Sequence, residues 1–388
     1  MSVHHQKFSV NFKYDVVFTR NLFAPENRTI VDVLPKTGTP ARMAFFIDSA
    51  VTEKWPGLAD TIVEWAGRNK EFVVLPERPM TVPGGEESKN NLMFVQRITH
   101  QLQRMQICRH SYCVAIGGGA MLDVIGLAAA VFHRGVRLIR VPTTVLSQND
   151  SGIGVKNSIN LDGVKNLIGS FAPPYAVLND SMFLTTLEDR DWYGGISEAF
   201  KVAIIKDAEF LSEMERRADA IRDHDLDAME YVVKRCAELH LDHIATAGDA
   251  FEMGSARPLD FGHWAAHKLE SMTNFELRHG EAVAIGIALD VYCAARLGFI
   301  SDADRDRICT AMRRCGMTLW HPIVEKKSGS GMYMVLNGLE EFRQHLGGRL
   351  TLTMPDGIGK KAEIHALASE IVADGIRWLA ESQKAVAK

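Results

Sequence analysis

Short apolar runs alternate with amphipathic helical patterns through the first half of the chain. Runs of strand length are separated by segments whose apolar residues recur at helical spacing. Strands are expected at residues 42–47, 71–75, 112–116 and 137–141, and helices at 58–68, 89–105 and 122–132. Because strands separated by helices of this length form βαβ units, this half predicts an α/β domain with a mostly parallel sheet.

Beyond about residue 187 the pattern becomes helical and strand patterns nearly vanish. Apolar residues recur at helical spacing over 196–206, 227–243, 262–273, 281–297 and 302–315. A chain of 388 residues also exceeds one typical domain. We therefore predict two domains, an α/β domain over residues 1–186 and an all-α domain over residues 187–388.

The composition is that of a globular protein with a full core. A net charge of −4 disfavours nucleic acid as the main partner, although a local basic pocket still suits a small anion. The N-terminus lacks the apolar stretch of a signal peptide, and the most apolar segment, 282–295, is interrupted by Asp290, so no membrane contact is expected. Six cysteines without paired metal-site spacing indicate reduced, mostly buried thiols and a cytoplasmic location.

Three consecutive glycines stand where a predicted strand ends and a helix begins. In the segment AIGGGAMLD, Gly117, Gly118 and Gly119 allow the backbone to approach a pyrophosphate, and the helix N-terminus adds free amide groups. The spacing is not the GxGxxG fingerprint, so a standard Rossmann domain is not predicted. A tight turn without a ligand is the alternative reading. Residues 83–89, PGGEESK, form a second glycine turn, with charges that suit ribose or phosphate or merely cap a helix.

The segment PTTVLSQNDSGIGVKNSINLDGVKNLIGS, which begins at Pro142, is long and polar for a compact domain. Its two threonines follow the carboxyl end of a strand, where ligands of open α/β sheets bind. Anion donors and a carboxylate come from Asp150, Lys156, Asn160, Lys165 and Asn166. A structured polar segment of this length is uncommon unless it is functional. Arg134, shortly before it, is either a phosphate contact or a surface arginine.

Side chains with metal-ligand chemistry occur in the helical half. His263 and His267 are one helical turn apart and share a helix face, and His279 follows later. Glu198 and Lys201 lie on neighbouring faces of an earlier predicted helix. Two histidines and a glutamate form a familiar catalytic zinc set that leaves room for substrate oxygens, and the same set suits ferrous iron. The residues alone do not show which histidine binds metal and which transfers protons.

Taken in order, these segments resemble the 3-dehydroquinate synthase superfamily of sugar phosphate cyclases. The resemblance covers about residues 80–290 and rests on the motifs GGExxK, GGGAxxD, RG, PTT, the Asp150-to-Lys156 spacing, Lys165-Asn166, GxxEAxK, FGHxxxH and RHGEAVAIG. Each motif is weak alone, but the ordered set is highly specific. The family's fold, an α/β NAD-binding domain followed by a helical metal-bearing domain, matches the predicted boundary.

The resemblance implies roles for individual residues and a homodimer. NAD would contact Asp48, Glu86, Lys89, Gly118, Gly119, Asp123, Thr143, Thr144 and Lys165. A divalent metal, Zn²⁺ or alternatively Co²⁺ or Fe²⁺, would be held by Glu198, His263 and His279. Substrate contacts would come from Arg134, Asp150, Lys156, Asn166, Lys201, Arg257 and Asp260. The catalytic groups would be Asp150, Lys156, His267 and Glu252, the last two in the positions of the family's proton-transfer groups.

The chemistry that the resemblance implies is redox-neutral. NAD⁺ transiently oxidises a ring alcohol held by the metal, which acidifies the neighbouring C–H. Phosphate then leaves by elimination, the hydride returns, and the opened enol closes as an intramolecular aldol. The metal would polarise the alcohol and later the carbonyl, while the lysines and Arg134 would neutralise the phosphate.

Several positions depart from 3-dehydroquinate synthase itself. Its lysine upstream of the metal-bearing helix falls at Asp242, and its asparagine before the FGH motif falls at Asp260. Both changes would put negative charge near a substrate carboxylate, which is repulsive. We therefore predict a neutral-headed sugar phosphate, such as the heptulose phosphate sedoheptulose 7-phosphate. Pro258 and Asp260 look like the valiolone synthase branch, His267 does not, and the combination looks most like the cyclase of ebo-type gene clusters.

Three alternatives remain open. A true 3-dehydroquinate synthase would act on the carboxylated shikimate precursor. A metal-dependent polyol dehydrogenase of the glycerol dehydrogenase type shares the glycine loop, the PTT turn and the metal geometry, but it would accumulate NADH. A degenerate cyclase that acts as a scaffold would need no metal.

Overall fold

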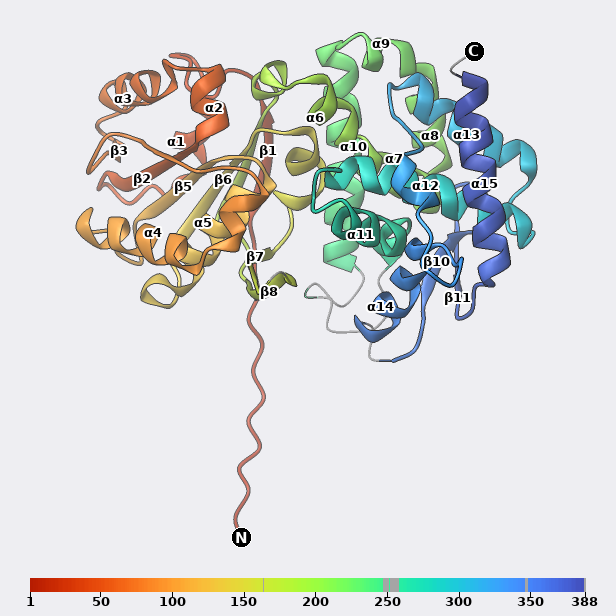
Figure 1. The fold of residues 1–388 in the computed structure, drawn as a ribbon. Coiled ribbons are helices and arrows are strands. Elements are labelled where there is room, and N and C mark those ends of the chain that lie inside the picture. The colour runs from red at the N-terminus through yellow and green to blue at the C-terminus, as the bar shows by residue number, and fades with distance from the viewer. Residues whose placement is uncertain (163, 247–250, 252–257, 346–347, 387–388) are drawn as a thin grey trace. The chain divides into compact units, whose positions relative to one another are not determined.

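The structure is a computed structural model that describes the whole chain except residues 163, 247–250, 252–257, 346–347 and 387–388 (Figure 1). The chain divides into two compact units. The first comprises Met1–Thr143 and Gly154–Asp180, and the second comprises Thr144–Ile153 and Ser181–Lys388. The short segment Thr144–Ile153 therefore groups with the helical unit, although it precedes residue 186 in the chain.

The first unit is built around a parallel sheet. Among the described residues the sheet has seven strands in the order β1-β9-β6-β5-β2-β3, with β4 also paired to β2, and the pairs are parallel. The strands are β1 (Asp15–Thr19), β2 (Ala41–Asp48), β3 (Val73–Val74), β4 (Met80–Val82), β5 (Tyr112–Gly117), β6 (Arg137–Pro142) and β9 (Ala176–Asp180). This confirms the predicted α/β fold with a mostly parallel sheet.

The helices of the first unit pack their apolar residues on this sheet. They are α1 (Thr29–Val33), α2 (Ser49–Lys54), α3 (Leu58–Arg68), α4 (Leu92–Arg104) and α5 (Gly119–Val131). The helix predicted at 89–105 is divided, because Asn91 accepts a hydrogen bond from the amide of Met93 at 2.9 Å and caps α4 after a 3-10 helix at Glu86–Asn90. The strand predicted at 71–75 shortens to Val73–Val74.

The polar segment after β6 folds into regular structure. A π-helical turn, Ser147–Ser151, lies in the second unit, and the hairpin of β7 (Lys156–Leu161) and β8 (Val164–Phe171) lies in the first. Gly126 allows α5 to pack closely on this hairpin, because a Cβ there would lie 1.8 Å from Oδ1 of Asn157. The hairpin is therefore held on α5 by close packing.

The second unit is mainly helical. Its helices are α6 (Asp189–Gly194), α7 (Ser197–Lys206), α8 (Ala208–Arg216), α9 (Ala218–Arg222), α10 (Leu226–Thr246), α11 (His263–Met272), α12 (His279–Arg296), α13 (Asp302–Arg314), α14 (Asn337–His345) and α15 (Ser369–Val386). An antiparallel pair, β10 (Leu352–Pro355) with β11 (Lys361–Ile364), adds strand structure that the sequence pattern does not anticipate.

Helix α12 is the buried centre of the second unit. It contacts α6, α7, α11, α13 and α15, and its residues from Ala282 to Ala294 are buried. Small residues permit the close contact with the start of α11, because a Cβ on Gly286 would lie 2.0 Å from the carbonyl oxygen of Gly262. Among the described residues, no helix combines the length and the apolar character needed to cross a membrane. All six cysteines are free thiols, and five of them are buried.

Candidate active site

The glycine turn of the first unit lies at the carboxyl end of β5. Gly118 is the N-cap of α5 and Gly119 its first residue, so the free amides of the helix begin at this turn. The buried carboxylate of Asp48, at the end of β2, accepts hydrogen bonds from the amide of Gly118 at 3.4 Å and from that of Ala50 at 3.0 Å. Burial raises the pKa of Asp48 despite these two amides. A Cβ on Gly117 would lie 2.9 Å from that of Asp48, so the turn needs glycine there.

A buried lysine joins the glycine-bearing helix to the hairpin. Nζ of Lys89 lies 2.6 Å from Oδ2 of Asp123 on α5, and the ammonium also donates to Oδ1 of Asn166 at 2.5 Å and to Oγ of Ser158 at 3.2 Å. Only 5% of the Lys89 side chain is exposed. These residues satisfy one another, so the network fixes β8 relative to α5.

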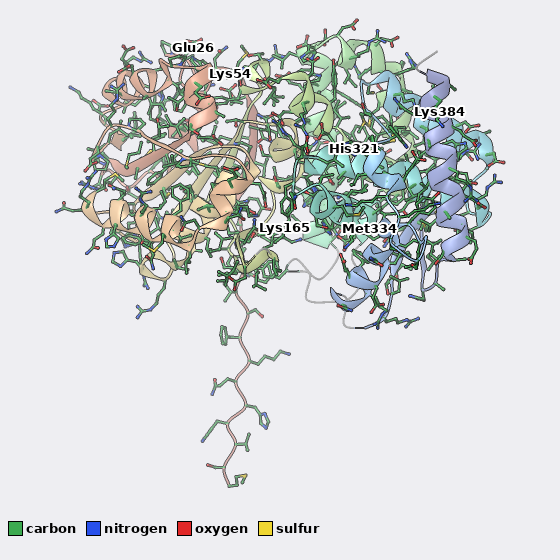
Figure 2. The ribbon with its side chains drawn as sticks, in the orientation of Figure 1. Glu26, Lys54, Lys165, His321, Met334 and Lys384 are labelled. Carbon is green, nitrogen blue, oxygen red and sulfur yellow. The ribbon has the colours of Figure 1, made fainter. Side chains whose placement is uncertain are left out.

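Glu86 and Lys165 extend the same network. Oε1 of Glu86 accepts a hydrogen bond from Nδ2 of Asn160 at 3.0 Å and lies 3.9 Å from Nζ of Lys165, which is labelled in Figure 2. The amide of Asn166 donates to Oδ1 of Asn160 at 2.9 Å. The structure therefore brings together five predicted residues, namely Glu86, Lys89, Asp123, Lys165 and Asn166.

Other predicted residues occupy the ends of elements. The amide of buried Thr143 donates to the carbonyl of Gly117 at 3.1 Å. Thr144, in the second unit, accepts a hydrogen bond at Oγ1 from the amide of Ser147 at 3.1 Å and stabilises the π-helical turn. Arg134 lies in the turn after α5 with a positive φ of 64°. Lys156 begins β7 and is exposed.

In the second unit, one glutamate and two histidines converge. Glu198 lies in the first turn of α7, while His263 and His279 are the first residues of α11 and α12. Nε2 of His263 lies 3.5 Å and Nε2 of His279 lies 3.6 Å from Oε1 of Glu198. One ligand atom from each residue lies within 4.8 Å of the other two. Three helix starts that are far apart in sequence thus meet at one point.

These separations fit a shared divalent cation. Two ligands at ordinary bond lengths of about 2.1 Å from a tetrahedral zinc ion are about 3.4 Å apart. The measured 3.5 and 3.6 Å between nitrogen and oxygen match that spacing. One carboxylate and two imidazoles also leave room for oxygen ligands from a substrate. Glu198, His263 and His279 are therefore suited to hold the metal.

Each histidine is oriented through its other ring nitrogen. Nδ1 of His263 lies 3.0 Å from the carbonyl oxygen of Phe261, and Nδ1 of His279 lies 3.2 Å from Oε2 of buried Glu270. Both contacts leave Nε2 directed towards Glu198. His267, Glu270 and His279 form a second set of close ligand atoms, but Glu270 approaches Nδ1 of His279 and so supports the first set.

The charges around Glu198 favour its ionised form. Burial alone would raise its pKa, but Lys201, with which it forms an ion pair, and His263 hold the pKa of Glu198 well below its usual value. Burial also opposes the charge on His279, yet the carboxylates of Glu270 and Glu198 outweigh it and raise the pKa of His279 to about 10. A bound metal ion can take the place of the cations that surround the buried carboxylate of Glu198.

Asp150 of the π-helical turn belongs to the same charge cluster. Its Oδ1 lies 2.8 Å from Nδ1 of His240 on α10. Burial and Glu198 act to raise the pKa of Asp150, but His240 and Lys201 lower it overall. Lys201 is buried, and Glu198 and Asp150 together raise its pKa against that burial. Lys201 therefore serves two carboxylates at once.

The remaining predicted residues have different outcomes. The ring of His267, which is exposed, lies 5.5 Å from that of His263 and 6.1 Å from that of His279. Asp260 precedes α11 in a short 3-10 turn and contributes to the charge environment of Lys201. Asp242 is exposed on α10, and its charge acts on Lys206. Glu252 and Arg257 lie outside the described residues.

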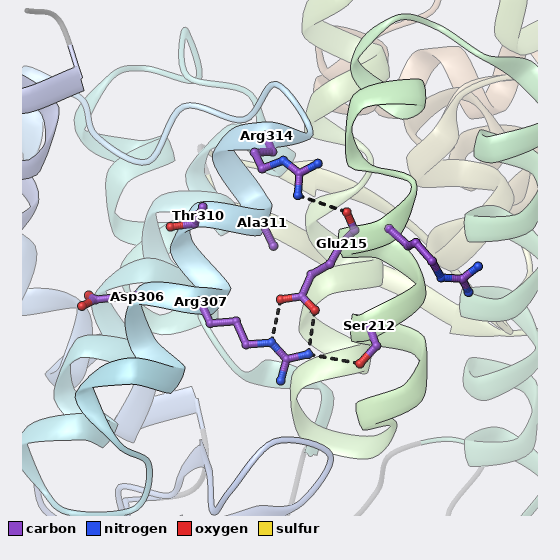
Figure 3. A pocket seen from close by; sticks show the side chains of 8 residues that line it. Ser212, Glu215, Asp306, Arg307, Thr310, Ala311 and Arg314 are labelled. Carbon is purple, nitrogen blue, oxygen red and sulfur yellow. Dashed lines mark hydrogen bonds and ion pairs between the residues drawn. The ribbon is translucent and has the colours of Figure 1, made fainter.

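An open groove between α8 and α13 contains none of these groups (Figure 3). Its arginines are engaged by acidic groups of the same unit. Arg307 donates to both carboxylate oxygens of Glu215, at 2.7 and 2.6 Å, and Arg314 donates to Asp219 at 2.9 Å. The groove is a surface of paired charges and does not form part of the candidate site.

Four polar residues support the site without being marked as site residues by the sequence, of which Arg140, Glu270 and Asp290 are buried and His240 is partly buried. Arg140 donates to the carbonyls of Gly154 and Lys156 at 2.8 and 2.9 Å and so holds the backbone that carries Lys156. His240, Glu270 and Asp290 support the second-unit cluster. Asp290 carries a usable signal, because it interrupts an otherwise apolar helix, whereas Arg140 and His240 pair with residues distant in sequence.

Two family models match consecutive parts of the chain. The model of the 3-dehydroquinate synthase N-terminal region matches residues 79–194, and that of the C-terminal region matches residues 195–335. The chain belongs to the 3-dehydroquinate synthase family. This confirms the resemblance drawn from the motifs and the two-domain fold, and it makes the chain a member of an enzyme family that includes phosphate-eliminating cyclases.

Solved structures of sugar phosphate cyclases resemble this member of the family over nearly its whole length. The 2-epi-5-epi-valiolone synthase of Streptomyces hygroscopicus subsp. jinggangensis, with NAD⁺ and Zn²⁺ bound, is 26% identical, has a TM-score of 0.85, and is matched over 98% of this chain and 100% of its own. A 2-deoxy-scyllo-inosose synthase in complex with carbaglucose-6-phosphate, NAD⁺ and Co²⁺ is 22% identical, with a TM-score of 0.75 and coverage of 94% and 96%.

A glycerol dehydrogenase shares the fold at lower similarity. The enzyme of Schizosaccharomyces pombe is 17% identical, with a TM-score of 0.60 and coverage of 97% of this chain and 92% of its own. The polyol dehydrogenase alternative is thus less supported than a cyclase.

Proposed function

We propose that this protein is a sugar phosphate cyclase that uses NAD⁺ and a divalent metal to convert a heptulose phosphate, such as sedoheptulose 7-phosphate, into a cyclitol ketone with release of phosphate. The observation that carries the proposal is the convergence of Glu198, His263 and His279 on one point in a member of this family. The valiolone synthase, at 26% identity over 98% of the chain, supports a substrate of the same size class.

The residues of the chain have distinct tasks in this proposal. Glu198, His263 and His279 would hold the metal, which when bound polarises a substrate hydroxyl and carbonyl, while NAD⁺ accepts and returns a hydride. The exposed ammonium of Lys156 and the guanidinium of Arg134 would bind the substrate phosphate and stabilise its charge as it leaves. His267 would carry the proton between substrate positions.

Asp260 supports a substrate without a carboxylate. It contributes negative charge beside Lys201, whose single positive charge is already shared by Glu198 and Asp150. A substrate carboxylate bound near this group would meet repulsion, whereas sugar hydroxyls can donate hydrogen bonds to Asp260 and Asp150. Asp242 does not contribute to this argument, because its charge acts on Lys206 and not on Lys201. The substrate proposal therefore rests on Asp260.

The experiment is a phosphate-release assay with purified protein, NAD⁺ and Zn²⁺. Sedoheptulose 7-phosphate, other heptulose phosphates and the carboxylated shikimate precursor are supplied separately, and Glu198→Gln serves as the inactive control. We expect phosphate release from a heptulose phosphate without net accumulation of NADH. Turnover of the carboxylated precursor alone contradicts the substrate proposal, and accumulation of NADH with a polyol contradicts the cyclase reaction.

A further inference from the structure

Asp290 is a buried carboxyl group on α12 whose hydrogen bonds both reach the start of α11. Only 1% of the surface of Asp290 is exposed. Oδ1 accepts a hydrogen bond from Nε1 of Trp264 at 2.7 Å, and Oδ2 accepts one from the amide of Gly262 at 2.9 Å. Residues 262 and 264 flank His263, so one carboxyl group holds both neighbours of a proposed metal ligand.

The backbone at this point has little freedom. Gly262 has a left-handed φ of 80°, and a Cβ there would lie 2.9 Å from the amide nitrogen of Ile287. From the opposite side, Gly286 permits α12 to approach the carbonyl of Gly262. The first turn of α11 therefore packs directly on α12, and the two hydrogen bonds of Asp290 join the two helices at this point.

Helix α12 is thereby connected to two ligands of the proposed metal site. It carries His279 as its first residue, and it holds His263 through the contacts of Asp290 with residues 262 and 264. The ring of His263 is then oriented by the carbonyl of Phe261, 3.0 Å from Nδ1. A small displacement at Gly262 would move Nε2 of His263 away from Glu198.

We propose that Asp290 is a positioning residue for the metal centre, which sets the geometry of His263 relative to Glu198 and His279. The inference rests on the metal site of the proposed function. A carboxyl group suits this task better than an apolar side chain, because it accepts two hydrogen bonds from donors fixed on another helix. Its role is geometric, since its two hydrogen bonds reach the neighbours of His263 and not the imidazole itself.

The test measures metal binding in the full chain. Asp290→Asn keeps the size of the side chain, but it replaces one of the two acceptor oxygens with a donor. Trp264→Phe removes one donor and leaves the carboxyl group intact. Asp207→Asn is the matched control, because Asp207 also accepts from a backbone amide, that of Phe210 at 3.0 Å, and from a side chain, that of Arg235 at 2.5 Å, at a position removed from α11. His263→Ala tests the site itself.

Affinity for Co²⁺ is measured by chelator competition, and the visible spectrum of the Co²⁺ protein reports ligand geometry. We expect Asp290→Asn to weaken Co²⁺ about tenfold and to change the spectrum, at the lower end of the effect of outer groups on metal sites. Trp264→Phe should change both in the same direction but less, and it remains informative if Asp290→Asn fails to fold. Asp207→Asn should lower the thermal midpoint and leave both metal readouts unchanged.

The outcomes separate the inference from the proposed function. If His263→Ala abolishes Co²⁺ binding while Asp290→Asn and Trp264→Phe keep the wild-type affinity and spectrum, Asp290 is only a structural anchor and the inference is overturned. If His263→Ala itself binds Co²⁺ as the wild type does, the proposed metal site fails.

Discussion

The two groups of candidate residues, one in each unit, differ in the arrangement of their charges. In the first unit, the ammonium of Lys89 is matched by Asp123 and by neutral oxygens, so the network around the glycine turn is closed. In the second unit, the buried carboxylate of Glu198 collects Lys201 and two imidazoles around itself. A closed network presents backbone and shape to a ligand, whereas a convergent cluster around a buried anion attracts a cation. The two proposed cofactors would therefore be recognised by different physical means.

The largest effect is expected for Glu198→Gln. The change keeps the shape of the side chain but removes the charge at the centre of the second-unit cluster. We expect affinity for Zn²⁺ to fall by about three orders of magnitude or more and phosphate release to be lost, because an anionic metal ligand becomes a neutral one and Lys201 loses its buried partner. Chelator competition and metal analysis measure this effect.

The control for this variant is Glu209→Gln, which removes a glutamate from the first turn of α8. It should leave metal content unchanged. Wild-type Zn²⁺ affinity in Glu198→Gln would mean that the cluster is a structural ion-pair network, and the contrast between the two units would disappear.

A second test compares the buried carboxyl groups of the two regions through pH. Burial raises the pKa of Asp290 to about 7, against the hydrogen bonds from Trp264 and Gly262, and burial also raises the pKa of Asp48. Below about pH 4 both the folded and the unfolded chain hold the proton, and the neutral acid contributes its full stabilisation. Between pH 4 and 7 the unfolded chain releases this proton and the folded chain keeps it. The contribution of Asp290 to the free energy of unfolding of the wild type therefore falls by up to about 4 kcal/mol.

The destabilisation caused by Asp290→Asn should therefore be largest near pH 4 and shrink as the pH rises towards 7. Asp48→Asn should show a trend of the same sign. Chemical denaturation of the metal-free protein across this pH range measures both, and the difference between wild type and variant cancels the other titrating groups. A penalty that grows with pH would mean that the folded Asp290 is ionised and that its hydrogen bonds outweigh its burial.

How much of each region can be predicted from the sequence depends on whether it is determined by local patterns or by contacts between distant segments. Local patterns determine the first unit, and the helix Leu58–Arg68 was predicted with both ends correct because its apolar residues recur regularly. The glycine turn was also predictable, since it depends on consecutive residues. The hairpin β7–β8 was not predictable, because its polar residues are buried by packing against α5 and do not follow an alternating pattern of buried and exposed positions.

The second-unit cluster depends on contacts between distant segments. Local patterns identified His263 and His267 as a pair and marked His279 and Glu198 as further candidates, but only the family resemblance separated the roles of the histidines. The supporting group His240 could not be predicted, because it meets Asp150 on a distant segment, whereas Asp290 interrupts an apolar helix but its partner Trp264 leaves no local signal. Pairing across helices leaves no periodic signal in the sequence.

The smallest effect is expected in the first unit. Lys89→Met removes the cation of the closed network, while Asp123 keeps a partly exposed carboxylate, 19% of its side chain being accessible. We expect a loss of about 2 kcal/mol of stability and a roughly tenfold weaker affinity for NAD⁺, because Lys89 is itself an expected NAD⁺ contact and β8, which carries Lys165, loses its anchor on α5. Affinity for Co²⁺ should stay at the wild-type value. Lys70→Met, at an exposed turn, is the control and should change neither affinity. Both affinities are measured on the same preparations, by NAD⁺ titration and by chelator competition. If Lys89→Met lowers the affinity for Co²⁺ as much as the affinity for NAD⁺, the two regions respond as one cooperative structure. Their different charge arrangements would then not correspond to separate binding functions.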